Sequence, residues 1–195
     1  MGKTINFCGD SYCDYVDSNA SKNSWCVLLA NYLEAKIIGG GKSATAYENA
    51  IKSYEPSSDY TVFCWTESHR LYHKDLMCTY KNGVRHLRNR KHHELLSVCA
   101  EIFYRELYDA KYFDELQMRS LYWFDNEVLS KYSGTILHFW NFNKTYTFKH
   151  GIEYPVILHN FTKQSNSSEE LNHMTPEQNK LVADEAYQLI RQHSG

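Results

Sequence analysis

The sequence predicts an α/β protein in which helices cover a mainly parallel β-sheet. Short apolar runs typical of buried strands alternate along the chain with longer segments of helical periodicity, and this order is typical of parallel β-α-β units. The chain has 195 residues, 43% of them hydrophobic, which is enough to bury one sizeable core. No internal repeat or linker-like composition divides it. We therefore expect one domain over residues 1–195.

Four segments are expected to form buried strands, because they are short, apolar and rich in β-branched or aromatic residues. They are residues 4–8, 35–38, 59–65 and 135–140. Glycine follows the first two directly, at Gly9 and Gly39, and glycine commonly ends a strand. A further short strand or extended segment is expected over residues 154–158.

Helices are expected where apolar residues recur every three or four positions. These segments are residues 23–34, 43–54, 94–132 and 176–192. The third is long enough for two helices, with a break near Tyr112. The last has Thr175 as its expected N-cap and Pro176 at its first helical position, where proline is favoured.

Residues 69–93 differ from the rest of the chain, since they hold seven Lys or Arg, five His and one acidic residue. We expect a basic helical insertion here. Its surface is either simply solvated or covers the functional edge of the sheet and binds an anionic substrate. A nucleic-acid-binding role is a third interpretation, which predicts binding that weakens steeply with salt. The net charge of −2 gives no overall indication of a nucleic-acid or membrane partner.

The cysteines and the apolar segments bear on the compartment. No stretch approaches the roughly 18 apolar residues of a membrane span, and the N-terminus lacks the length of a secretory signal. We expect a cytoplasmic protein. The six cysteines lie mostly in apolar segments without a CxxC pair, so free thiols are expected rather than disulfides or zinc. No HExxH motif occurs, and we expect no metal site.

Polar residues follow three of the expected strands, where an open α/β sheet binds its ligands. These groups are Gly9-Asp10-Ser11, the glycine-rich stretch 39–43 and Thr66-Glu67-Ser68. His173 lies before the last helix, in a loop that could return to the same edge. Serine, histidine and a nearby carboxylate are the groups required for nucleophilic acyl transfer.

Two segments at opposite ends of the chain resemble the SGNH (GDSL) hydrolase family. INFCGDSYCDY (5–15) is similar to the family's first block, in which Gly-Asp-Ser follows an apolar strand. ELNHMTPEQNKLVAD (170–184) is similar to its last block, in which an acid precedes the catalytic histidine by three residues. The family usually has Asp at this acid position, and this chain has Glu170. The resemblance spans nearly the whole chain and implies a three-layer α/β/α sandwich of flavodoxin-like type.

The resemblance also implies the catalytic roles. Ser11 would be the nucleophile, His173 the general base, and Glu170 the residue that orients the imidazole. The backbone N–H of Ser11 would be one oxyanion donor. We expect Asp10 to hydrogen-bond the turn rather than to join the chemistry.

The remaining oxyanion donors correspond to two less faithful blocks. IIGGGKSATAYEN resembles the second block, with Gly40 at its first glycine and Ser43 at the oxyanion-hole glycine. A slip of one or two residues would move that role to Gly41 or Lys42. In the third block, FCWTESHR, Glu67 stands at or near the position of the family's donor asparagine.

An ionised Glu67 would oppose a developing oxyanion. Removing one oxyanion donor costs on the order of 3 kcal/mol. A buried, protonated Glu67 could donate instead, or Thr66, Ser68 or His69 could take the place.

The predicted reaction is hydrolysis of an ester or acetyl ester through an acyl-Ser11 intermediate, without a cofactor. A small-molecule, carbohydrate or lipid ester would be the substrate. The alternative is a non-catalytic SGNH-like module that binds a glycan or anionic ligand. The position and protonation of Glu67 discriminate between the two.

Overall fold

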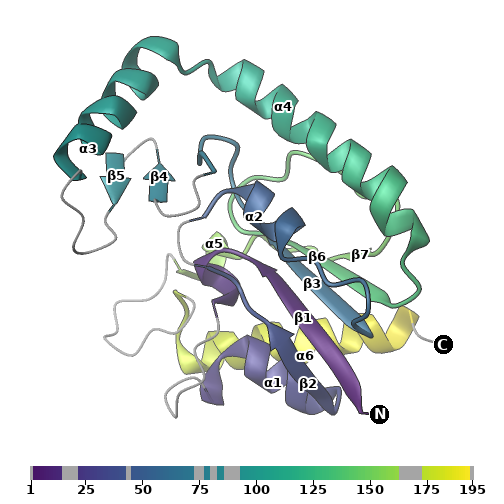
Figure 1. The fold of residues 1–195 in the computed structure, drawn as a ribbon. Coiled ribbons are helices and arrows are strands. Elements are labelled where there is room, and N and C mark those ends of the chain that lie inside the picture. The colour runs from purple at the N-terminus through teal and green to yellow at the C-terminus, as the bar shows by residue number, and fades with distance from the viewer. Residues whose placement is uncertain are drawn as a thin grey trace.

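A central sheet of five strands, all parallel, organises the computed structural model (Figure 1). The structure describes residues 2–14, 22–42, 45–72, 77–79, 83–85, 93–162 and 173–193. The strands are β1 (Lys3–Gly9), β2 (Ala35–Gly39), β3 (Tyr60–Trp65), β6 (Thr135–Trp140) and β7 (Ile152–Glu153). Their order across the sheet is β2-β1-β3-β6-β7, which is the flavodoxin-like arrangement. The predicted α/β fold class is confirmed.

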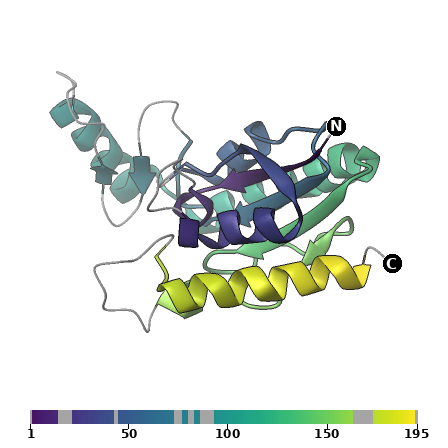
Figure 2. The ribbon, with the colours of Figure 1, turned by 90° about the horizontal axis from the view of Figure 1, so that it is seen from below.

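Helices cover both faces of this sheet (Figures 1 and 2). Helices α1 (Trp25–Tyr32) and α6 (Pro176–His193) pack side by side on one face. Helices α2 (Tyr47–Lys52) and α4 (Ala110–Trp123) lie on the other. The remaining helical segments are the 3₁₀ turns η1 (Ser11–Cys13) and η5 (Leu129–Lys131), the π-helical segments η3 (Phe103–Leu107) and η4 (Phe124–Val128), and the helices α3 (His93–Ile102) and α5 (His159–Thr162).

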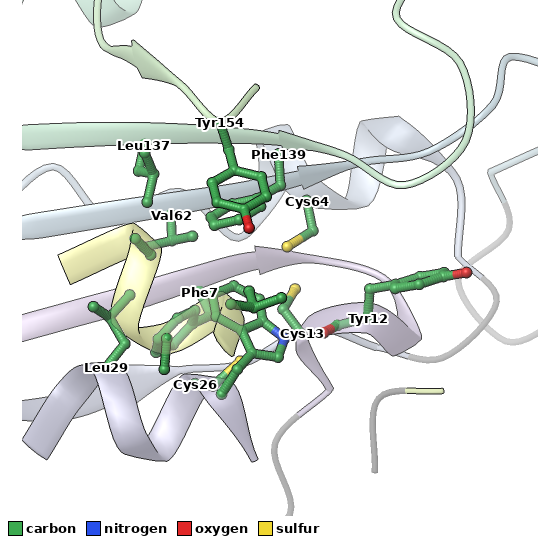
Figure 3. Packing of buried hydrophobic residues seen from close by; sticks show 14 of the residues in the cluster. Phe7, Tyr12, Cys13, Cys26, Leu29, Val62, Cys64, Leu137, Phe139 and Tyr154 are labelled. Atoms are coloured by element: carbon green, nitrogen blue, oxygen red, sulfur yellow. Dashed lines mark hydrogen bonds between the residues drawn. The ribbon is translucent and has the colours of Figure 1, made fainter. Parts of the chain in front are cut away.

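Two apolar clusters hold the layers together. Successive side chains of a strand point to opposite faces, so Val62 and Cys64 pack toward α1 and α6 while Phe63 and Trp65 pack in the other cluster. Figure 3 shows the first cluster, in which Phe7 lies among side chains of the neighbouring strands and of α1. Strands β1, β3 and β6 are buried on both faces over most of their length. Such strands have continuous apolar sequences, which is why the sequence identifies them.

Three predicted elements need correction. No strand covers residues 154–158, because β7 ends at Glu153 and Pro155 has no N–H to give to a ladder. The segment 94–132 contains two main helices, as predicted, but they separate at 108–109 rather than near Tyr112. The Asp109 side chain accepts a 3.2 Å hydrogen bond from the Tyr112 backbone N–H, and this cap starts α4 earlier.

The basic stretch 69–93 is not the expected helical insertion in its described parts. Strands β4 (Met77–Thr79) and β5 (Gly83–Arg85) pair antiparallel as a separate two-stranded sheet. The Asn-Gly pair at 82–83 is a sequence signal for a hairpin that the prediction overlooked, and Gly83 is the first residue of β5, paired with Thr79. Residues 73–76, 80–82 and 86–92 lie outside the described residues.

The structure describes five cysteines, all as free thiols, which agrees with the prediction for them. Four are buried and one is exposed: Cys8, Cys13, Cys26 and Cys64 in the core, and Cys99 on α3. Among the helices of the described ranges, none has the length and apolar character needed to cross a membrane.

Candidate active site

Ser11 and His173 meet at the carboxyl end of the sheet. Ser11 begins the turn η1 directly after β1, and His173 lies shortly before α6. Ser11 Oγ and His173 Nε2 are 2.7 Å apart, although 162 positions separate the residues in the chain. The strand order reverses between β1 and β3, and such a switch point is where flavodoxin-like sheets bind ligands. When Nε2 is unprotonated, the Ser11 hydroxyl donates to it, as general-base activation requires.

His173 has an unusual backbone conformation. Its φ is +63°, and among the described residues only Glu34, at +52°, is another non-glycine residue with positive φ. This left-handed region costs energy for a residue with a Cβ, and functional sites often store such strain. The His173 ring lies 5.0 Å from the Tyr12 ring, with 47° between their planes. From this turn the imidazole reaches Ser11 through Nε2.

Asp10 organises the turn from beneath. Its side chain is fully buried and accepts hydrogen bonds at Oδ1 from Tyr12 N, at 3.0 Å, and from Asn141 Nδ2, at 2.7 Å. Arg70 Nη1 donates to Oδ2 at 2.6 Å. Burial raises the pKa of Asp10, and the charge of Arg70 opposes that shift. Asp10 therefore hydrogen-bonds the turn, as predicted.

The glycine-rich stretch 39–41 packs against the nucleophile turn. Gly41 N donates to Cys13 O at 2.8 Å, and Lys42 N donates to Gly9 O at 2.9 Å. Both amides are engaged in holding the two turns together, so neither serves as the oxyanion donor in a slipped alignment. Gly40 lies half-buried just after β2. The other donor position of this block, Ser43, lies outside the described residues, and so does Glu170.

Replacing Gly41 by alanine tests this close packing. A Cβ at position 41 would lie 2.2 Å from Asp10 O and 2.7 Å from Cys13 Sγ. We expect Gly41→Ala to lower the free energy of unfolding by about 1–3 kcal/mol, as overpacking does, in a urea titration. Gly2→Ala is the matched control, because a Cβ there meets nothing within 4 Å. Equal stability of the two variants would contradict the packing argument.

The polar side chains of the third block, residues 66–68, make different contacts. Glu67 Oε2 pairs with His69 Nε2 at 3.3 Å, and 26% of the Glu67 side chain is exposed. Ser68 Oγ hydrogen-bonds Asp114 on α4. Thr66 is buried; its hydroxyl makes no hydrogen bond of normal geometry to the described residues, but it lies near enough to Asp10 to favour the ionised carboxylate. Glu67 is therefore partly exposed rather than buried.

Five residues near Ser11 were not in the predicted site. Arg70 and Asn141 bind Asp10, as described above. Tyr12 OH lies 3.0 Å from His159 Nδ1, and the Phe142 ring lies 5.7 Å edge-on from the Tyr12 ring. Asn141 follows β6 as Thr66 follows β3, so the strand-end rule could have found it. Phe142 and His159 carry no local signal.

Comparisons of the chain with protein-family models, with curated proteins and with solved structures gave no match. The geometry of the chain's own residues is therefore the basis on which a function is assigned.

Proposed function

We propose that this protein is a serine hydrolase that cleaves an ester or acetyl ester through an acyl-Ser11 intermediate. The observation that carries the proposal is the 2.7 Å contact between Ser11 Oγ and His173 Nε2. In this reaction Ser11 Oγ attacks the carbonyl carbon while His173 takes its proton. His173 then gives the proton to the leaving alcohol, and a water activated by His173 releases the acid. No cofactor enters these steps.

Membership of the SGNH family is part of the same proposal. It is supported by the position of Gly9-Asp10-Ser11 after β1, by His173 before α6 and by the flavodoxin-like strand order. Glu170 would complete the triad. Carbohydrate and lipid esters are the substrate classes that the proposal includes.

A second candidate function is a non-catalytic module that binds a glycan or anionic ligand. The observation that favours it is Glu67, since a carboxylate stands where a hydrogen-bond donor is expected. The pairing of Glu67 with His69 weakens this argument, because the carboxylate already has a partner. The hydrolase therefore has the stronger support.

A cytoplasmic location belongs to the proposal as well. Four free thiols lie in the core, and free thiols persist in a reducing compartment.

The test is covalent labelling with a fluorophosphonate probe and mapping of the modified residue by mass spectrometry. We expect the label on Ser11 and none in Ser11→Ala. The matched control is Ser130→Ala, since Ser130 is exposed on η5 and its hydroxyl donates to Asn126 O in the adjoining segment η4. No labelling of a folded wild-type sample would reject the hydrolase and leave the binding module.

A further inference from the structure

A largely buried arginine hydrogen-bonds the residue next to the proposed nucleophile. Arg70 follows β3, and its guanidinium donates to Asp10, the residue directly before Ser11, at 2.6 Å. The Cζ atom of Arg70 lies 5.1 Å from the centre of the Phe142 ring. Only 11% of the Arg70 side chain is exposed. Two faces of the site, the nucleophile turn and the chain after β6, therefore fix the guanidinium in place.

Most of the donors of this guanidinium are uncommitted. Arginine has five N–H groups and no acceptor, and the described contacts of Arg70 use Nη1 alone, toward Asp10. Nε is buried without an acceptor among the described residues. The remaining exposed surface of the side chain therefore belongs to other atoms. Buried donors without partners are rare in native proteins, and each needs a physical explanation.

Among the described residues 66–68 of the third block, no side chain is a free donor exposed to solvent, because the unpaired hydroxyl of Thr66 is buried. The side chain at the third oxyanion position is Glu67, which pairs with His69, and Ser68 is bonded to Asp114. The amides of Gly41 and Lys42 hold the nucleophile turn. A cationic donor next to Asp10 would supply what these groups do not.

We propose that Arg70 donates a hydrogen bond to the oxyanion that forms when Ser11 attacks its substrate, in place of the side chain at position 67. The inference rests on the proposed hydrolase function. As the bond from Ser11 Oγ to the carbonyl carbon forms, the π electrons of the carbonyl move onto its oxygen, and His173 takes the serine proton. Arg70 stabilises the resulting negative charge without giving up a proton, since arginine stays protonated in proteins. When the carbonyl re-forms, the alkoxide leaves with the proton of His173.

The test compares how fast variants react with a fluorophosphonate, because attack at phosphorus also places negative charge on an oxygen. We expect Arg70→Gln to lower the limiting rate constant of labelling by about 100-fold or more, as loss of one oxyanion donor does. The half-saturating probe concentration should stay within a few-fold of wild type, because the interaction belongs to the transition state. Arg119→Gln is the matched control: Arg119 is exposed on α4 and pairs with Glu115.

A second pair of variants separates this role from support of Asp10. Arg70→Gln alone leaves the buried Asp10 carboxylate unpaired, which can unfold the protein. Asp10→Asn and the double variant Asp10→Asn/Arg70→Gln both lack that charge. Arg70 as oxyanion donor predicts that the double variant reacts about 100-fold more slowly than Asp10→Asn. Arg70 as a mere support of Asp10 predicts equal rates for these two variants, and that result overturns the inference.

The outcome for the wild type keeps the two proposals apart. If Ser11 of the wild type is not labelled, the hydrolase proposal fails and takes this inference with it. If the wild type is labelled and Arg70→Gln reacts at the same rate, only the role of Arg70 is rejected.

Discussion

Replacing His173 by glycine is expected to slow the reaction of Ser11 with a fluorophosphonate at least about 1000-fold while the fold remains intact. The imidazole is the group within 2.7 Å of Ser11 Oγ that can take its proton. Without a base, serine is a weak nucleophile at neutral pH, and loss of the histidine of such a pair removes most of the rate.

The expected stability of this variant distinguishes a catalytic from a structural histidine. The side chain of His173 is exposed, and its backbone φ of +63° is one that glycine adopts without a steric penalty. Relief of this strain offsets the lost contacts to Ser11 and Tyr12. We expect the free energy of unfolding to stay within about 1 kcal/mol of wild type in a urea titration.

Glu34→Gly is the matched control for this experiment. Glu34 is exposed, has a φ of +52° and lies between α1 and β2. The control relieves the same kind of strain and should not change the labelling rate. Labelling of His173→Gly at the wild-type rate would show that another group activates Ser11.

Strands of the sheet could be predicted from the sequence where they are buried on both faces, because such strands have continuous apolar sequences. Every residue of 61–65 and of 136–140 is buried, so the composition of these segments alone marks strands. Strand β7 has no such signal, because it is the two residues Ile152–Glu153, defined by pairing with Leu137 and His138. Its existence depends on where β6 lies, which local composition does not encode.

In the candidate site, too, some residues could be predicted from local sequence and others could not. Ser11 and His173 could be predicted because each lies in a recognisable local pattern at one end of the chain. Arg70 and Asn141 could not, because their significance comes from contacts with Asp10 across 60 and 131 positions. In the sequence Arg70 is one of several basic residues, and only the folded chain singles it out.

Acid should destabilise this protein through one buried histidine. His138, in the middle of β6, is fully buried. Burial lowers its pKa from the ordinary value of 6.5 to about 4. Its Nδ1 accepts a 3.0 Å hydrogen bond from Trp65 Nε1, a group that can only donate, so Nδ1 carries no proton. Nε2 then donates to His150 O at 2.9 Å.

Protonation of His138 would place a hydrogen on Nδ1 against the N–H of Trp65. The folded state therefore resists protonation, whereas the unfolded chain takes up the proton near pH 6.5. Between pH 6.5 and pH 4 the unfolded state binds more protons, so stability falls as the pH is lowered through this range. The difference between the two pKa values corresponds to a loss of about 3 kcal/mol, complete below pH 4.

The measurement is the free energy of unfolding from urea titrations at pH 7, 6, 5 and 4, for wild type and His138→Gln. The variant loses ring stacking with Phe148, whose centroid lies 3.7 Å away, and is expected to be less stable at every pH.

The two proteins should differ in how their stability depends on pH. Between pH 7 and pH 4, the free energy of unfolding of wild type should fall by about 3 kcal/mol more than that of the variant. Carboxylates such as Asp125 titrate in both proteins and cancel in this difference. Parallel curves for wild type and His138→Gln would show that His138 is not the acid-sensitive group, because the only titrating group that distinguishes the two proteins is the imidazole at position 138.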